Sequence, residues 1–157
     1  MISWALYALA AIFVLDALKM RGRLRKIAVL PDDKNRVAGV KRVLLCSGKV
    51  YYDLIASRRE RNREDVAILR IEQLYPLQPE DMQHVLQPYP DETPLVWVQE
   101  EPENMGAWRR MRGKFGERWF GRLPFSGIYR PASARPATGS SGSHKLEQKK
   151  LLDEAFA

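Results

Sequence analysis

The sequence is poor in the residues that build cysteine- and histidine-based sites. Its 157 residues contain one cysteine, Cys46, and two histidines, His84 and His144. A single cysteine excludes an internal disulfide and a cysteine-ligated zinc cluster. Two histidines so far apart give no spacing typical of a metal site or a Ser-His-Asp triad. Cys46 lies in a short apolar run, so we expect a small strand residue, in a protein of the reducing cytoplasm.

An excess of negative charge is also absent, because the formal net charge is +7. A basic chain can attract nucleic acid, anionic lipid or phosphorylated ligands. Here the lysines and arginines are scattered over several segments, without the interleaved aromatic residues that stack bases. The sequence therefore argues against nucleic-acid binding. Solvated helix faces, or a surface that docks on acidic protein, explain the charge instead.

No apolar run is long enough for a comfortable membrane span. Ile2 to Leu15 is apolar at all but one position and Asp16 interrupts it, whereas a spanning helix needs about 20 residues. The basic cluster Lys19 to Lys26 follows the run, unlike a secretory signal, which carries its positive charges first. Three interpretations stay open for residues 1–25: a membrane tether through residues 2–18, a packed apolar helix, and a truncated or shifted reading frame.

The rest of the chain alternates apolar runs with amphipathic segments. We expect a polar linker over residues 26–39 and a domain over residues 40–157. Alternating strands and helices at this spacing predict βαβ units and a mostly parallel sheet. The predicted strands are Val43–Cys46, Val66–Ile71, Leu95–Val98 and a short Ile128–Arg130; the predicted helices begin near Val50, Pro79 and Trp108, the last running to about Phe120, and a final helix is capped by Ser143.

Two segments at predicted strand ends are candidate sites. Backbone N–H groups after Ser47-Gly48-Lys49 could bind an anion at a helix start, although a tight turn explains the glycine equally. Glu100 and Glu101 are adjacent carboxylates. Neighbours on a strand point to opposite faces, so we expect a structural role in a loop or at an interface rather than paired acid–base chemistry. Trp108 follows this loop and could reach a subunit interface.

Three blocks of the sequence resemble the C-terminal domain of 2-oxoglutarate dehydrogenase, in that family's order and spacing, over roughly residues 27–157. The resemblance implies a transketolase C-terminal-type fold, a Rossmann-like α/β sheet with helices on both faces. The blocks are Val40–Leu54; Val66–Pro76 continuing into Trp97–Trp108; and Arg130–Ala134 with Pro136–Gly139, His144 and Gln148–Phe156.

The resemblance also implies a function for the longer enzyme. That family decarboxylates 2-oxoglutarate with thiamine diphosphate and Mg²⁺ and passes the succinyl group to the lipoyl arm of a succinyltransferase, a step of the tricarboxylic acid cycle. Two preceding domains hold the cofactor, and neither fits in 157 residues. We therefore expect a bacterial, cytoplasmic fragment that binds no thiamine diphosphate or metal and contributes no catalytic residue. Its expected role is to stabilise the dimer and frame the active-site entrance.

Some members of that family bind AMP or acetyl-CoA as regulators around this domain. Ser47, Lys49 and Gln99 stand on matching motifs and are our candidate regulator contacts, while Glu100, Glu101 and Trp108 are our interface candidates. The alternative function is a stand-alone interaction or nucleotide-sensing module, tethered to a membrane by residues 2–18. The chain departs from the family pattern where Met105 replaces a common Gln, where Tyr129 replaces a common Gly, and over Arg112 to Ser126, which matches poorly.

Overall fold

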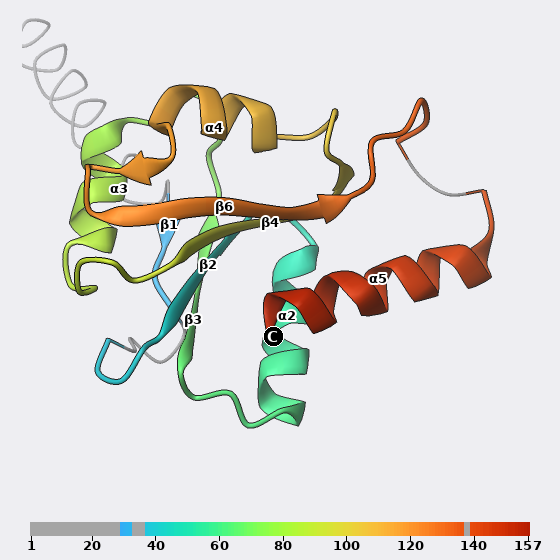
Figure 1. Cartoon of the computed structure of the whole chain (residues 1–157), viewed down its shortest axis with the longest axis horizontal. Coiled ribbons are helices and arrows are strands. Elements are labelled where there is room, and N and C mark those ends of the chain that lie inside the picture. Colours follow the sequence, from blue (N-terminus) through green and yellow to red (C-terminus); the bar gives the residue numbers. More distant parts are fainter. Residues whose placement is uncertain (1–28, 33–36, 137–138) are drawn as a thin grey trace, which may run out of the picture.

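A six-stranded sheet of order β1-β3-β2-β4-β6-β5 organises the chain (Figure 1). The computed structural model describes residues 29–32, 37–136 and 139–157. Ten elements alternate along these residues: β1 Val29–Leu30, β2 Arg42–Cys46, α2 Val50–Glu60, β3 Val66–Ile71, α3 Pro79–Leu86, β4 Leu95–Pro102, α4 Trp108–Phe115, β5 Arg118–Trp119, β6 Leu123–Arg130 and α5 Ser141–Ala155.

The four central strands, β3, β2, β4 and β6, are parallel, as the spacing of strands and helices predicted. The two edge strands are antiparallel, so the sheet is mixed and the predicted parallel character holds only for its centre. Both edges escaped prediction because each has only two residues. β5 turns back into β6 through Phe120 and Gly121, which both have positive φ, as a tight hairpin turn requires.

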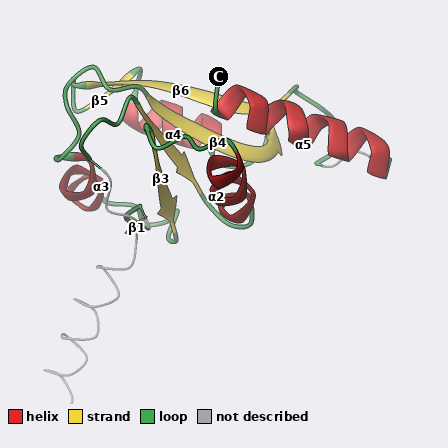
Figure 2. Cartoon of the chain, turned by 90° about the horizontal axis from the view of Figure 1, so that it is seen from below, coloured by secondary structure: helices red, strands yellow, loops and turns green. Residues whose placement is uncertain are grey.

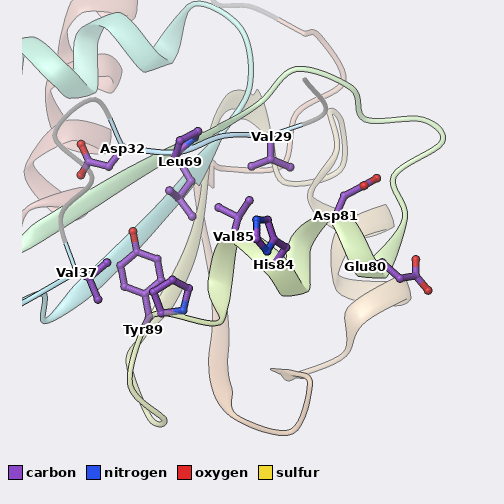
Figure 3. A pocket seen from close by; sticks show the side chains of 11 residues that line it. Val29, Asp32, Val37, Leu69, Glu80, Asp81, His84, Val85 and Tyr89 are labelled. Carbon is purple, nitrogen blue, oxygen red and sulfur yellow. The ribbon is translucent and has the colours of Figure 1, made fainter. Parts of the chain in front are cut away.

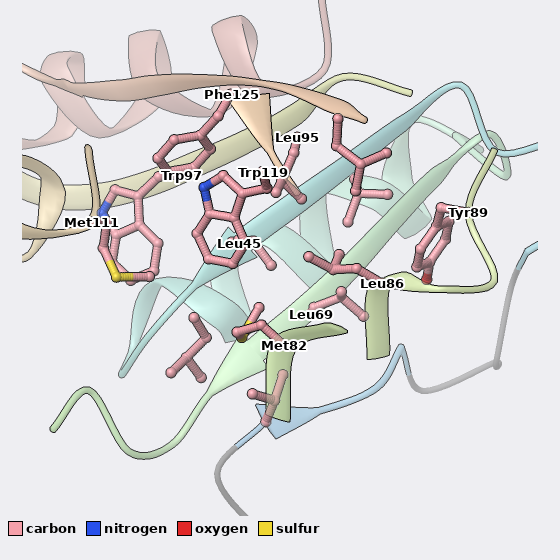
Figure 4. Close-up of a cluster of buried hydrophobic side chains, with 14 of the residues drawn as sticks. Leu45, Leu69, Met82, Leu86, Tyr89, Leu95, Trp97, Met111, Trp119 and Phe125 are labelled. Atoms are coloured by element: carbon pink, nitrogen blue, oxygen red, sulfur yellow. The ribbon is translucent and has the colours of Figure 1, made fainter. Parts of the chain in front are cut away.

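Helices cover both faces of the sheet, as the family resemblance implied (Figures 1 and 2). On one face, Met82 and Leu86 of α3 and Met111 of α4 pack with Trp97 and Trp119 (Figure 4). On the other face, α2 and α5 pack on alternate strand residues such as Leu44 and Val98. The central strands are buried on both faces because their apolar runs are continuous.

The first described residues, which we had expected to be part of a linker, belong to the sheet. β1 pairs with β3, and Asp32 follows it into the interior. The Asp32 carboxylate accepts hydrogen bonds from Arg58 Nη1 at 2.7 and 2.9 Å and from the backbone N–H of Ile68 at 3.2 Å. The side chains of Asp32 and Arg58 are 0% and 3% exposed. The ion pair thus links the segment after β1 to α2, and the hydrogen bond from Ile68 links it to β3.

Several predicted boundaries need correction. α4 ends at Phe115 rather than near Phe120, because Gly116 adopts a φ of +70° and turns the chain. β4 continues past Val98 to Pro102, and β6 begins at Leu123, well before the predicted Ile128. α5 begins at Ser141 with Ser140 at its N-cap position, so Ser143 is not the cap.

The predicted apolar N-terminal helix and basic cluster, residues 1–25, lie outside the described residues. Within the described ranges, no helix is long and apolar enough to cross a membrane.

Candidate functional site

The most informative site lies where the parallel strand order reverses, between β2 and β4. β2 connects onward to β3 on one side and β4 connects onward to β6 on the other, so the connections after these two adjacent strands lead in opposite directions. Ligands of open α/β sheets bind in this crevice. Ser47 and Lys49 follow β2, and Glu100 lies near the end of β4. The Lys49 ammonium is 3.6 Å from Glu100 Oε1.

The turn after β2 has the geometry that the sequence predicted. Gly48 has a φ of +69°, which glycine adopts without strain, and open space surrounds the position of a Cβ atom. Lys49 is the N-cap of α2, and its side chain is exposed. Ser47 is half-buried beside it. The structure therefore brings Ser47, Lys49 and Glu100 to one edge of the sheet.

Gln99 lies apart from these residues. Its side chain is 3% exposed and sits on the face of β4 that carries Trp97. Gln99 Nε2 donates to the carbonyl oxygens of Met105, Pro102 and Glu101, at 2.8, 3.1 and 3.3 Å. Oε1 accepts from Trp97 Nε1 and from the backbone N–H of Trp108, at 2.8 and 2.9 Å. Both polar atoms of this amide are thus engaged, and they join the end of β4 to the following loop and to the start of α4.

Trp108 packs inward. It is 9% exposed, and its ring lies against Phe125 and Tyr129 with centroids 5.4 and 5.3 Å apart. A Cβ atom on Gly127 would lie 2.6 Å from the Trp108 ring, so β6 needs a glycine there. Glu101, by contrast, is exposed. Of the interface candidates, Glu101 is therefore the one that a partner could reach directly.

A cluster of side chains around Arg70, at the end of β3, extends the same edge of the sheet. Arg70 Nε lies 2.6 Å from Glu72 Oε1, and Arg70 Nη1 donates to the Tyr52 hydroxyl at 3.1 Å. The hydrogen bond with Tyr52 raises the pKa of Arg70 above its ordinary value. The guanidinium carbon lies 5.2 and 5.3 Å from the ring centroids of Tyr51 and Tyr52. Only the alignment of Cys46 with Arg70 across parallel β2 and β3 could have revealed this cluster.

A network of polar side chains joins β6, α5 and α2. Arg130, 7% exposed, donates from Nη2 to Gln148 Oε1 at 3.1 Å and lies 3.2 Å from His144 Nδ1. Gln148 Nε2 in turn donates to Asp53 Oδ2 of α2 at 2.9 Å. His144 therefore takes part in packing the first turns of α5 against β6. Both figures show α5 extending past the end of β6 (Figures 1 and 2).

A mainly apolar pocket of about 700 Å³ lies elsewhere, between β1, β3 and α3 (Figure 3). Val29, Leu69 and Val85 form its apolar wall, and exposed His84 also lines it. Burial raises the pKa of the Tyr89 hydroxyl to about 12, so it stays neutral here. The lining is mainly apolar, so the pocket offers a surface suited to binding an apolar group.

Cys46 is a strand residue, as predicted. It is fully buried, its Sγ lies 3.8 Å from the Leu69 carbonyl oxygen, and burial raises the pKa of the thiol to about 12. The thiolate is the reactive form, so this thiol is inert in the folded chain. Across the part of the chain that the structure describes, no three His, Cys, Asp or Glu side chains gather in a way that could hold a metal ion.

The parallel centre, the antiparallel edge strands and the helices on both faces define a mixed α/β domain. A family model described as 2-oxoglutarate dehydrogenase C-terminal matches residues 18–156. The chain therefore belongs to the 2-oxoglutarate dehydrogenase C-terminal family, as the three sequence blocks indicated.

Similar proteins agree with this assignment. The chain is 48% identical over 118 residues to the 2-oxoglutarate dehydrogenase E1 component of Haemophilus influenzae, covering 75% of the chain and 13% of that protein. It is 46% identical over 130 residues to the 2-oxoglutarate dehydrogenase E1 component of Cupriavidus necator, covering 82% of the chain and 14% of that protein. A probable 2-oxoadipate dehydrogenase complex component E1 homolog of Dictyostelium discoideum is 40% identical over 126 residues, with 80% and 14% covered. The chain thus spans only a small part of these relatives.

Proposed function

We propose that this chain is the architectural C-terminal domain of a 2-oxoglutarate dehydrogenase E1 component, with a domain proper at residues 40–157 and an ordered lead-in from Val29. The family match over residues 18–156 carries this proposal. In it, the complete enzyme decarboxylates 2-oxoglutarate and passes succinyl to a lipoyl succinyltransferase. The chain itself supplies a rigid body that stabilises the dimer and frames the entrance to the active site, and the protein is cytoplasmic.

The chain covers 13% and 14% of two of the E1 relatives that it matches, so most of the enzyme lies outside this match. The proposal therefore leaves the cofactor to the larger part of the enzyme that lies outside this match. The contribution of this chain is the shape and stability of the loop that Gln99 holds after β4.

Self-association tests the architectural role. We expect the purified chain to form dimers through the surface around the β4–α4 loop, where Glu101 is exposed. Glu101→Arg should weaken the dimer about tenfold or more, because reversing a charge inside an interface misplaces its partners. Sedimentation equilibrium measures the dissociation constant. Glu60→Arg makes the same charge change on exposed α2 and should leave association unchanged. A chain that stays monomeric at high concentration contradicts the proposed dimer role.

The turn after β2 favours a second, regulatory role at the same edge. We infer that Ser47 and Lys49 contact AMP or acetyl-CoA, because an exposed ammonium and a helix start meet at the strand switch. Gln99 anchors the neighbouring loop instead, since its amide faces away and is fully engaged.

Thermal unfolding with each nucleotide tests this regulatory role. We expect AMP or acetyl-CoA to raise the Tm of the chain, since a ligand that binds only the folded state stabilises it. Lys49→Ala should abolish the increase by removing the cation. Lys41→Ala removes an exposed ammonium from the opposite end of β2 and should retain the increase. If neither nucleotide changes the Tm of the unmodified chain, the regulatory role is refuted.

A further inference from the structure

We propose that the outward face of α4, together with Tyr75 of the β3–α3 loop, is a docking surface for an acidic segment of a partner protein. α4 forms an outer layer over β4 and β6 (Figure 1). Its buried residues, Trp108 and Met111, face the sheet. Arg109, Arg110 and Lys114 are exposed on the other side. We call these three residues with Tyr75 and Gly113 the α4 surface.

The arginines of the α4 surface differ from the neighbouring arginines in their ion pairing. Arg112 pairs with Glu117, Arg118 with Glu92 and Arg122 with Asp91. By contrast, Arg109 and Arg110 form no ion pair within the described part of the chain. Their guanidinium groups are therefore open to carboxylates from outside, which they can bind in a bidentate fashion.

Tyr75, the aromatic residue of the α4 surface, is held next to α4 within the chain itself. Tyr75 is 75% exposed, and the Arg110 guanidinium carbon lies 4.7 Å from its ring centroid. Lys114 Nζ donates to the carbonyl oxygen of Leu77, which ties the Tyr75 loop to α4. Tyrosine and arginine are the residue types most enriched at the energetic centres of protein interfaces. Because loop and helix are joined before any partner arrives, little ordering entropy is lost on binding.

Gly113 leaves room for a partner to approach the helix. It lies one turn after Arg109, and no atom occupies the space within 4 Å of its Cβ position. This open space lets a peptide backbone approach the helix at the turn between Arg109 and Lys114.

The size and borders of the α4 surface favour a protein over a nucleic acid. Sustained nucleic-acid binding relies on several phosphate contacts along a track of cations. Here the flanking arginines Arg112, Arg118 and Arg122 are paired with Glu117, Glu92 and Asp91. These pairs add little net positive charge beyond the α4 surface, which therefore suits a short acidic stretch better than a long polyanion.

Two-dimensional NMR of the full ¹⁵N-labelled chain tests this inference, with a peptide of alternating Glu and Ala as the probe. We expect saturable amide shifts at Tyr75 and residues 109–114. The double variant Arg109→Ser and Arg110→Ser should bind the peptide about tenfold more weakly, and Tyr75→Ser should also weaken binding. The matched control, Lys145→Ser and Lys149→Ser, removes the same charge from exposed positions of α5 and should bind as the unmodified chain does.

Three results would overturn the inference. The first is the absence of amide shifts at the α4 surface, and the second is equal weakening of binding by both double variants, which would mean attraction by net charge alone. The third is displacement of the peptide by a single-stranded oligonucleotide that shifts the same residues more strongly. Thermal unfolding of each variant checks that it remains folded. Both arginines are exposed, so their replacement should leave the Tm close to that of the unmodified chain.

Discussion

Replacing Asp32 with Ala should lower the free energy of unfolding by about 3–5 kcal/mol, because breaking a buried ion pair by removing one member is strongly destabilising. Arg58 would keep a hydrogen bond to the Val66 carbonyl oxygen at 3.2 Å but lose its hydrogen bonds to the Asp32 carboxylate. The backbone N–H of Ile68 would lose its acceptor as well. Urea denaturation measured by tryptophan fluorescence gives the change in free energy.

Asp153→Ala is the matched control. The Asp153 carboxylate pairs with Arg61 at 2.5 Å, but the two side chains are 49% and 37% exposed. Exposed pairs contribute about 0–1 kcal/mol, so this variant should unfold close to the unmodified chain. Similar losses for the two aspartate variants would show that burial of the Asp32–Arg58 pair does not matter for stability.

Gln99→Glu should be the second most damaging change. The substitution keeps the shape of the side chain but replaces the Nε2 donor with an oxygen that faces the carbonyl oxygens of Glu101, Pro102 and Met105. A buried polar group without a partner costs about 1–3 kcal/mol, and a charged one costs more. We therefore expect a loss of about 3 kcal/mol or more near neutral pH, with loosening of the loop that precedes α4.

The loss caused by Gln99→Glu should depend on pH. Burial among carbonyl oxygens disfavours the ionised carboxylate, so its pKa in the folded chain is raised above the value of about 4.3 in the unfolded chain. The ionisation penalty is absent below the unfolded pKa, grows as the pH rises, and is complete above the folded pKa. Urea denaturation across this range measures the effect. Gln87→Glu, at an exposed helix end, should show no such trend; an equal loss at every pH would contradict this account.

The centre of the fold was predictable because its signals are local. Val43–Cys46 and Val66–Ile71 are uninterrupted apolar runs, and each became a central parallel strand with almost the predicted bounds. The proline and acidic residues that open α3 likewise marked its start correctly. The two-residue strands β1 and β5 have no periodicity to detect, and only tertiary pairing defines them.

The candidate site was predictable only in part. The Ser47-Gly48-Lys49 turn follows a recognisable strand, so its place at the edge of the sheet could be inferred from the sequence. Arg58 belongs to a run of charges that indicated a solvated helix end, yet its side chain is 3% exposed because Asp32, 26 residues earlier, reaches it. Gln99 was a candidate regulator contact because it stands on a motif that matches the family. Its hydrogen-bond partners include a loop whose path sequence patterns do not give.

The burial of Cys46 makes the chain convenient for site-directed spectroscopy. No other cysteine occurs in the sequence, and this one lies at the centre of the sheet, where β2 is paired with β3 and β4. A cysteine introduced on the surface would therefore be the sole group that a maleimide dye modifies in the native protein. Conversely, labelling of Cys46 itself would require β2 to be exposed to the dye, so the labelling rate would measure how often the centre of the sheet opens.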